Sequence, residues 1–336
     1  MSDPQTDLER AVAILRGGGL VALPTETVYG LAVDAANEVA VRRMFAVKGR
    51  PASHPVIVHL AEPDQLAAWA RVVPPVALKL AEAYWPGPLT IVLPRSAKAL
   101  DVVTGGQDTV ALRVPDHALA LEVLRAFGGG LAAPSANRFG HVSPTTADHV
   151  REDLGAEVDL VLDGGPCRVG VESTIVDLAS DPERPRVMRR GAVLASDIAT
   201  LLGVPVGIAI AEPDPSTPPE EMRVPGSHEA HYAPRAGVEL VSAAEAAGRA
   251  EALSGPPSRR VVLIAPESVA APALSLEQRL NAPTDPAEFA RALYALLRNA
   301  DALAADVALV VPPPESGLGE AVRDRLRRAA RGRRKP

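Results

Sequence analysis

The stretch from Val47 to His59, VKGRPASHPVIVH, gathers side chains that could hold an anion. Lys48 and Arg50 lie two residues apart, and His54 and His59 flank an apolar segment that is typical of a strand. Because arginine offers a two-pronged donor and lysine a point charge, the two cations could converge on one phosphate group. The same residues could instead solvate a loop, with each histidine in a structural role. The stretch therefore predicts a phosphate contact or a solvated loop.

Two further polar segments stand beside predicted strands. In TVALRVP, Thr109 and Arg113 are four residues apart, so they face the same side of a strand. An arginine that faces inward on an apolar strand needs an anionic partner, either a carboxylate of the protein or a ligand. In PTETVYG, Glu26 and Thr27 directly follow a strand, at the end where α/β sheets usually bind ligands. The alternative for this second segment is a turn that caps the next element.

Two turns add small hydroxyl and amide groups to this set. Ser135 and Asn137 lie in APSANRFGHVSPT, and Ser173 begins a strand in GVESTIVD. Together with exposed backbone N–H groups, such side chains form a nest for a phosphate or a base edge. The sequence has no G-x-x-x-x-G-K-[ST] loop, G-x-S-x-G turn or H-E-x-x-H helix. An enzyme for nucleotides built on this chain must therefore hold phosphates with these polar turns.

Hydrophobic periodicity predicts the elements that position these side chains. Helices are expected over 7–16, 37–48, 119–127 and 145–155, the last with a threonine cap. Strands are expected over 20–23, 55–60, 89–94, 109–115, 131–133, 158–165 and 173–179. Strands and helices alternate, but the gaps near 100–115 and 165–190 are short enough for hairpins. We therefore predict an α/β domain with a mixed sheet rather than a purely parallel one.

The second half of the chain has a different composition. Residues 211–227, AEPDPSTPPEEMRVPGS, are rich in Pro, Glu and Ser, which is typical of a stiff linker. Beyond it, GVELV, RRVVLIAP and DVALVVPPP predict strands separated by helices, in a Rossmann-like rhythm without a G-x-G-x-x-G fingerprint. We predict three parts: a main α/β domain over 1–205, a Pro-rich linker over 206–236, and a small α/β domain with a basic tail over 237–336.

Composition limits the classes of protein that fit. The 336 residues are 47% apolar, which suffices for buried cores, and no apolar run reaches the roughly 18 residues of a membrane span. Cys167 is the only cysteine, so we predict neither a disulfide nor a protein-bound metal. The polar, acidic start of the chain predicts a cytoplasmic protein. A net charge of −6 argues against indiscriminate nucleic-acid binding. The basic tail, 322–336, is either a solvated helix end or a weak contact for RNA or an acidic partner.

Taken together, these motifs resemble the YrdC-type threonylcarbamoyl-AMP synthases in their long, two-domain form. The resemblance rests on GGLVALPTETVYGLAVDA, FAVKGRPASHPVIVHL, WPGPLTIVL, VALRVPDH, APSANRFGHVSPT and LDGGPCRVGVESTIVD, and on PGSHEAHYAPRAGVEL at the second domain. It implies a YrdC-like twisted mixed sheet with flanking helices and a smaller Rossmann-like α/β C-terminal domain.

The resemblance also implies a reaction. Such a nucleotidyltransferase makes L-threonylcarbamoyl-AMP from L-threonine, bicarbonate and ATP with Mg²⁺, and releases pyrophosphate. This is the first step of tRNA threonylcarbamoyladenosine (t6A) modification, and the product passes to a tRNA-modifying threonylcarbamoyl transferase complex.

The resemblance assigns roles to residues of this sequence. Catalysis through phosphate contacts is expected of Lys48 and Arg50. The ATP contacts that it implies are Arg50, His54, Thr109, Ser135, Asn137, Ser143, Arg190 and Tyr232, the last reaching back from the linker as part of a lid. The L-threonine contacts that it implies are Thr27, His59, Arg113, Ala133 and Ser173.

Two alternatives remain open from the sequence. A basic, concave sheet could grip double-stranded RNA through its phosphates without adenylating anything. The motifs also resemble a carbamoyl-transfer domain of hydrogenase-maturation proteins, but acylphosphatase-like and zinc-finger segments are missing here. A small polar pocket built from Thr27, Ser135 and Ser173 favours an adenylating site, because an RNA surface that tracks phosphates has no need of one.

Overall fold

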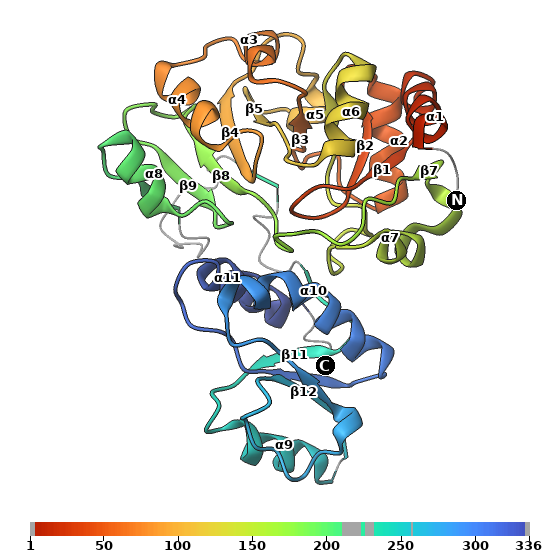
Figure 1. The fold of residues 1–336 in the computed structure, drawn as a ribbon, viewed down its shortest axis with the longest axis vertical. Coiled ribbons are helices and arrows are strands. Elements are labelled where there is room, and N and C mark those ends of the chain that lie inside the picture. Colours follow the sequence, from red (N-terminus) through yellow and green to blue (C-terminus); the bar gives the residue numbers. More distant parts are fainter. Residues whose placement is uncertain (1–3, 210–222, 226–231, 257, 333–336) are drawn as a thin grey trace. The chain divides into compact units, whose positions relative to one another are not determined.

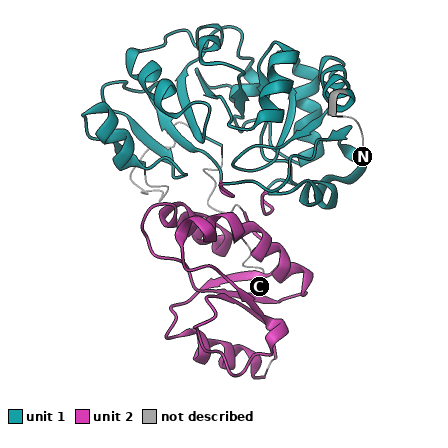
Figure 2. Ribbon diagram, in the orientation of Figure 1, with its two compact units in different colours: residues 1–139, 144–168, 172–227 teal, residues 140–143, 169–171, 228–336 magenta. Residues whose placement is uncertain are grey.

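The computed structural model describes residues 4–209, 223–225, 232–256 and 258–332, and these residues form two compact units (Figure 2). The first unit comprises Met1–Phe139, Pro144–Arg168 and Glu172–Ser227. The second unit comprises Gly140–Ser143, Val169–Val171 and His228–Pro336. Most of the predicted linker lies outside the described residues. Each unit has its own sheet.

The first unit is built on a ten-stranded sheet (Figure 1). Antiparallel pairing joins β4 to β5 and β8 to β9, whereas β3 with β5 and β4 with β8 are parallel. The sheet is therefore mixed, as predicted. In sheet order the strands are β10 (Gly207–Ile208), β9 (Arg186–Arg189), β8 (Thr174–Asp177), β4 (Leu89–Pro94), β5 (Thr109–Arg113), β3 (Ile57–His59), β6 (Leu131–Ala132), β2 (Gly30–Asp34), β1 (Val21–Leu23) and β7 (Leu160–Val161).

Helices cover the sheet and close a large aliphatic core. The helix α1 packs against α6 and β2, and α2 packs against β2. Asn37 caps the start of α2, where its side chain accepts from the Ala40 N–H at 3.1 Å, and the predicted threonine cap, Thr146, precedes α7. The helices are α1 (Pro4–Arg16), α2 (Glu38–Lys48), α3 (Leu66–Trp69), α4 (Pro75–Tyr84), α5 (Asp101–Thr104), α6 (Ala118–Phe127), α7 (Ala147–Leu154) and α8 (Ala195–Leu202).

The periodicity missed one strand that matters for the site. GLAVD forms β2, which pairs antiparallel with β1 on one side and with β6 on the other. Four of its five residues are buried, so it lacks the alternation of polar and apolar residues that marks a half-exposed strand. Because β1 and β2 are neighbours, the PTETVY segment between them becomes a loop at one edge of the sheet.

The second unit is a smaller parallel sheet with helices on both faces. Its strands are β11 (Gly237–Leu240), β14 (Val307–Val310), β12 (Val261–Ala265) and β13 (Arg279–Asn281), in that order. The helices α10 (Pro286–Ala302) and α11 (Gly319–Arg331) pack against each other on one face, and α9 (Ala246–Ser254) lies on the other (Figure 1). This confirms the predicted Rossmann-like α/β unit, with the short β13 added.

The described part of the basic tail is helical and partly buried. Arg325 and Arg328 on α11 are buried, and both pair with Asp324, at 2.6 and 3.1 Å. Burial opposes ionisation of Asp324, but the two arginines outweigh it and hold the pKa of this carboxyl below its usual value. These two cations are therefore packing residues, whereas 333–336 lie outside the described residues. Within the described residues, no helix is long and apolar enough to cross a membrane.

The packing around Gly130 generates a stability prediction. A Cβ atom at this position would lie 2.4 Å from Trp69 Cζ2 and 2.7 Å from Val58 Cγ1, inside the core. We expect Gly130→Ala to lower the free energy of unfolding of the first unit by about 1–3 kcal/mol, because a closely packed core cannot absorb the methyl group without shifting. Urea unfolding followed by tryptophan fluorescence measures it, since both tryptophans, Trp69 and Trp85, lie in this unit.

The matched control is the same substitution where space is open. Gly248 is exposed on α9, and a Cβ there would meet nothing within 4 Å. Gly248→Ala is expected to stabilise the second unit by about 0.5–1 kcal/mol, through the lower flexibility of the unfolded chain. Slower hydrogen exchange of the backbone amides in α9 would measure this gain in stability. Equal effects of the two substitutions would contradict this account of the packing.

Candidate active site

Arg113 is held in one orientation by three contacts from two segments, the Glu26–Thr27 loop and Gly87. Its Nη2 lies 2.7 Å from Glu26 Oε2, its Nη1 donates to Thr27 Oγ1 at 3.0 Å, and its Nε donates to the Gly87 carbonyl at 3.2 Å. The Arg113 and Glu26 side chains are both almost fully buried. The anionic partner that the sequence required is thus Glu26. The guanidinium plane is fixed, and it keeps N–H groups that these contacts do not use.

The loop that supplies Glu26 and Thr27 is shaped by its own hydroxyl groups. Thr25 Oγ1 accepts from the Thr27 and Val28 N–H groups at 3.1 and 3.2 Å, and it donates to the Val28 carbonyl at 2.7 Å. Its hydroxyl also lies 2.9 Å from that of Thr27. This is a turn of the Ser/Thr type, the alternative predicted for PTETVYG, while a ligand contact of this segment stays a prediction. The turn closes the loop and aims Thr27 at Arg113.

His59 stands beside Arg113 in the sheet. The parallel pairing of β3 with β5 sets His59 opposite Arg113, so their side chains share one face. Burial, reinforced by the Arg113 charge, lowers the pKa of His59 to about 3. The imidazole is therefore neutral at physiological pH. It adds hydrogen-bonding capacity to the site without adding a second positive charge.

Ser173 is held by a residue that the sequence did not single out. Arg189 donates to the Ser173 hydroxyl from Nη2 and to its carbonyl from Nε, both at 3.0 Å, and to the Pro225 carbonyl from Nη1 at 2.9 Å. The adjacent Arg190, predicted to contact ATP, is half-buried. The sequence favours Arg190 over Arg189 for that contact, because Arg190 directly precedes the glycine in MRRG. The antiparallel register, which pairs Ile175 with Arg189, decides which one reaches Ser173.

The face of the sheet that carries His59 and Arg113 also has an apolar region. Ile57, Val92, Ala111 and Ile175 form a cluster with Met188 and Val224. Because side chains alternate along a strand, this cluster lies on the face that carries His59 and Arg113.

Two further predicted contacts lie beside these strands. Ala133 donates its N–H to the Ile57 carbonyl at 3.0 Å, and Thr109 begins β5 in a half-buried position.

A second group of predicted residues gathers around Lys48. Its Nζ donates to the Ser135 and Asn137 carbonyls, each at 2.5 Å, and only 2% of the residue is exposed. Burial, together with the nearby Arg50, lowers the pKa of Lys48 well below its usual value. Lys48 therefore braces the turn that carries Ser135 and Asn137, which explains why these two segments, far apart in the sequence, meet.

Phe139 contacts three residues of the Val47–His59 stretch, namely Lys48, Arg50 and His54. Its N–H donates to the Lys48 carbonyl at 2.7 Å, and the Arg50 guanidinium lies 5.7 Å from the centre of its ring. The His54 ring lies 5.3 Å from it, tilted. Arg50 also donates to the Pro55 carbonyl at 2.8 Å and is 9% exposed. The cations of this stretch are thus organised by the fold and do not merely solvate a loop.

Two of the predicted ATP contacts, Ser143 and Tyr232, belong to the second unit. Ser143 is buried. Tyr232 has a φ of 62°, in the left-handed region, and its ring stacks on Tyr294 with centres 5.9 Å apart. The Arg325 guanidinium lies 5.1 Å from the Tyr232 ring. Such a backbone conformation costs about 1–3 kcal/mol, which these contacts must offset.

Within the described ranges, neither the cysteine thiol nor a cluster of metal ligands is set up for chemistry. Burial, with a smaller effect of Glu26, raises the pKa of Cys167 to about 12, so its thiol stays protonated. No cluster of three or more His, Cys, Asp or Glu side chains within the described ranges could hold a metal ion. Mg²⁺ that is carried by substrate phosphates and water, its usual mode of binding in phosphate-transfer sites, needs no such cluster.

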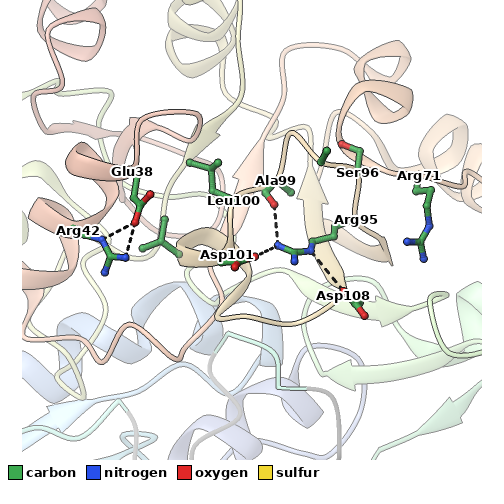
Figure 3. Close-up of a pocket in the computed structure, with 11 residues that line it drawn as sticks. Glu38, Arg42, Arg71, Arg95, Ser96, Ala99, Leu100, Asp101 and Asp108 are labelled. Atoms are coloured by element: carbon green, nitrogen blue, oxygen red, sulfur yellow. Dashed lines mark hydrogen bonds and ion pairs between the residues drawn. The ribbon is translucent and has the colours of Figure 1, made fainter.

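A cavity of about 590 Å³ lies elsewhere in the first unit (Figure 3). Its lining includes Glu38, Arg42, Arg71, Arg95 and Asp101, and none of the residues predicted from the sequence. Most of its charges pair with one another: Arg42 with Glu38, and Arg95 with Asp101, each at 2.5 Å (Figure 3). The cavity is therefore distinct from the two groups of residues described above.

Known protein families match almost the whole chain. A family described as telomere recombination matches residues 13–191, and one described as threonylcarbamoyl-AMP synthase, C-terminal domain, matches residues 193–331. The threonylcarbamoyl-AMP synthase of Pyrococcus abyssi is 39% identical over 326 residues, covering 95% of this chain and 93% of that protein. The protein of the same name from Bacillus subtilis is 37% identical over 337 residues, covering 99% and 94%.

The solved structures agree with these matches. The crystal structure of Pyrococcus abyssi Sua5 complexed with L-threonine aligns with a TM-score of 0.89 and 38% identity, covering 99% of this chain and 96% of that one. Fold, site and matches define an enzyme of the YrdC-like α/β class, a nucleotidyltransferase. The chain belongs to the threonylcarbamoyl-AMP synthase family, which confirms the resemblance predicted from its motifs.

The neutral, buried His59 predicts how stability depends on pH. Its pKa is about 3 in the folded protein and near 6.5 when unfolded, so between these values the unfolded chain binds a proton that the folded chain excludes. Stability is therefore complete above about pH 6.5 and falls as the pH is lowered, by at most about 1.4 kcal/mol per pH unit from this residue.

Replacing the residue tests this directly. In His59→Asn, which cannot titrate, the loss of unfolding free energy between about pH 7 and about pH 5 should be smaller than in the wild type by about 1 kcal/mol or more. Urea unfolding at the two pH values gives the difference. Identical losses in the two proteins would mean that the imidazole is accessible to protons in the folded state.

Proposed function

We propose that this enzyme makes L-threonylcarbamoyl-AMP from L-threonine, bicarbonate and ATP, with release of pyrophosphate. One observation carries the proposal: a single α/β unit holds both a fixed Arg113 with hydroxyl neighbours and a Lys48–Arg50 cluster braced on a polar turn. The first set suits the carboxylate of an amino acid, and the second suits phosphates. Support comes from the related Pyrococcus abyssi Sua5, which was crystallised in complex with L-threonine.

The proposed chemistry needs positioning rather than covalent catalysis. The amine of threonine attacks CO₂ and loses a proton, or attacks bicarbonate and releases water, and so yields a carbamate. An oxygen of the carbamate then attacks the α-phosphorus of ATP, and pyrophosphate leaves. The protein then has to orient two anions and balance the charge that develops between them. Lys48 and Arg50 are the proposed phosphate contacts, and Arg113 with Thr27 is the proposed anchor of the amino acid. The protonated Cys167 is consistent with a reaction that needs no nucleophile from the protein.

The remaining assignments extend this proposal. His54, Thr109, Ser135, Asn137, Ser143, Arg190 and Tyr232 are proposed to contact ATP, and His59, Ala133 and Ser173 to contact L-threonine. Mg²⁺ is proposed to bind with the triphosphate and to share its charge. The product is proposed to pass to a tRNA-modifying threonylcarbamoyl transferase complex, as the first step of t6A formation. The location proposed for the enzyme is the cytoplasm.

Pyrophosphate release tests the reaction and separates it from the RNA alternative. With ATP and Mg²⁺ present, release should require both L-threonine and bicarbonate, since the carbamate forms only from the two together. The assay omits each in turn. Release that ignores either substrate would refute the proposal. Salt-dependent binding of double-stranded RNA without any turnover would favour the alternative of an RNA-binding module.

Arg50→Ala tests the phosphate role. We expect kcat to fall by about 10²–10³-fold, because a charged group that stabilises the transition state is lost. Arg42→Ala is the matched control: Arg42 is exposed on α2 and forms a surface pair with Glu38. This control should leave kcat within about twofold, since exposed pairs contribute little. Similar rates for Arg50→Ala and the wild type, with both proteins folded, would exclude Arg50 from catalysis.

A further inference from the structure

Two buried hydroxyl groups face each other at the start of β4 and β8. Thr90 Oγ1 and Ser173 Oγ lie 2.8 Å apart, and both residues are fully buried. Arg189 Nη2 also donates to Ser173 Oγ, at 3.0 Å. Among the described residues, neither hydroxyl has a hydrogen-bond partner beyond these. The pair is therefore a closed group whose hydrogen atoms can be counted.

The count leaves one hydroxyl hydrogen without an acceptor. The two side chains carry two O–H hydrogens, and the bond between them uses one. If Thr90 is the donor, the Ser173 hydrogen is left over; if Ser173 is the donor, the Thr90 hydrogen is left over. Arg189 can only donate, so it takes neither. Since buried polar hydrogens are nearly always bonded, this spare donor points to an acceptor that the described part of the chain does not supply.

The register of the sheet puts this donor beside Arg113, on the same face. In the antiparallel pair of β4 and β5, Ile91 is opposite Leu112, so Thr90 comes opposite Arg113 one residue further along. On the other side of β5, the parallel pairing sets His59 opposite Arg113. Paired residues project to one face, so Thr90, Arg113 and His59 form a single row across three strands. Ser173 joins the row through its bond to Thr90.

We propose that the Thr90–Ser173 pair donates one hydrogen bond to the α-carboxylate of the bound amino acid, which makes Thr90 a further binding residue for the substrate. The inference rests on the proposed function, because it takes L-threonine as the ligand. A carboxylate is the acceptor that a fixed guanidinium and a neighbouring hydroxyl donor can bind together. Arg189 fixes Ser173 from the other side, so the donor direction is set before the ligand arrives.

Thr90→Val is the direct test, because valine keeps the shape of threonine and removes the hydroxyl. We expect the Kd of L-threonine, measured by calorimetry on the full chain, to rise about tenfold, the loss typical of one hydrogen bond to a charged group. Thr90→Ser keeps a hydroxyl and should stay within about twofold of the wild type. If Thr90→Val does not fold, Thr90→Cys, a weak donor of similar size, takes its place with the same expected direction.

A matched control separates a ligand contact from general damage. Thr174 is also buried on β8, but its hydroxyl donates to the Val193 carbonyl at 2.7 Å and accepts from the Val193 N–H at 3.1 Å. As the residue after Ser173 it faces the opposite side of the strand. Thr174→Val should lower the melting temperature while leaving the Kd of L-threonine within about twofold. If Thr174→Val weakens binding as much as Thr90→Val does, the inference is overturned.

An analogue of the substrate identifies the acceptor. L-2-Aminobutyrate is L-threonine without its hydroxyl, so both ligands share the carboxylate. The same fold loss for both ligands in Thr90→Val supports the carboxylate. A loss confined to L-threonine overturns it in favour of the substrate hydroxyl, and no loss for either excludes Thr90 from the site. These binding measurements do not need turnover, so a failure of the pyrophosphate assay would refute the proposed reaction without deciding the role of Thr90.

Discussion

The buried ion pair of Arg113 and Glu26 is the constraint on which the arrangement of the site depends. An arginine on an apolar strand is tolerated only because a carboxylate from the β1–β2 loop lies 2.7 Å away. Breaking such a pair is costly, since the remaining charge would be buried alone. The pair therefore ties the loop to the middle of the sheet. Thr27 follows Glu26 and completes the contact, so the loop conformation and the orientation of Arg113 are set together.

The Arg113–Glu26 pair also sets the balance of charge around it. Glu26 balances Arg113, and His59 is kept neutral by burial and by the arginine charge. The rest of this region consists of hydroxyl groups and an apolar patch. Around Lys48 and Arg50 the balance differs, because two cations are drawn together by backbone carbonyls and an aromatic ring. The first unit thus carries a nearly neutral region on its sheet and a second region, at the end of α2, that gathers Lys48 and Arg50.

Much of the fold could be predicted from the sequence, because segments with strong hydrophobic periodicity form the helix or strand that their pattern indicates. The periodic segments that became α2, α6 and α10, and the strands β4, β5 and β12, formed where their apolar spacing indicated. The misses have a physical reason. The strand β2 is buried on both faces and shows no alternation, and β9 and β13 are short strands whose existence depends on their neighbours. The identity of the partner of Arg113 also needed the pairing of strands distant in the sequence.

The residue types follow from the sequence alone: two cations beside a strand, an arginine that required an anion, and hydroxyl groups at the ends of strands. Its motifs also determined the family, since their order and spacing persist along the chain. Only the tertiary structure decided which groups meet. Strand register selected Arg189 over Arg190 for Ser173 and set Thr90 in the row of Arg113, and a turn some 90 residues away supplied the carbonyls that brace Lys48. Hydrogen bonds act over about 3 Å, so chemistry carried by separate segments exists only once the sheet has brought them together.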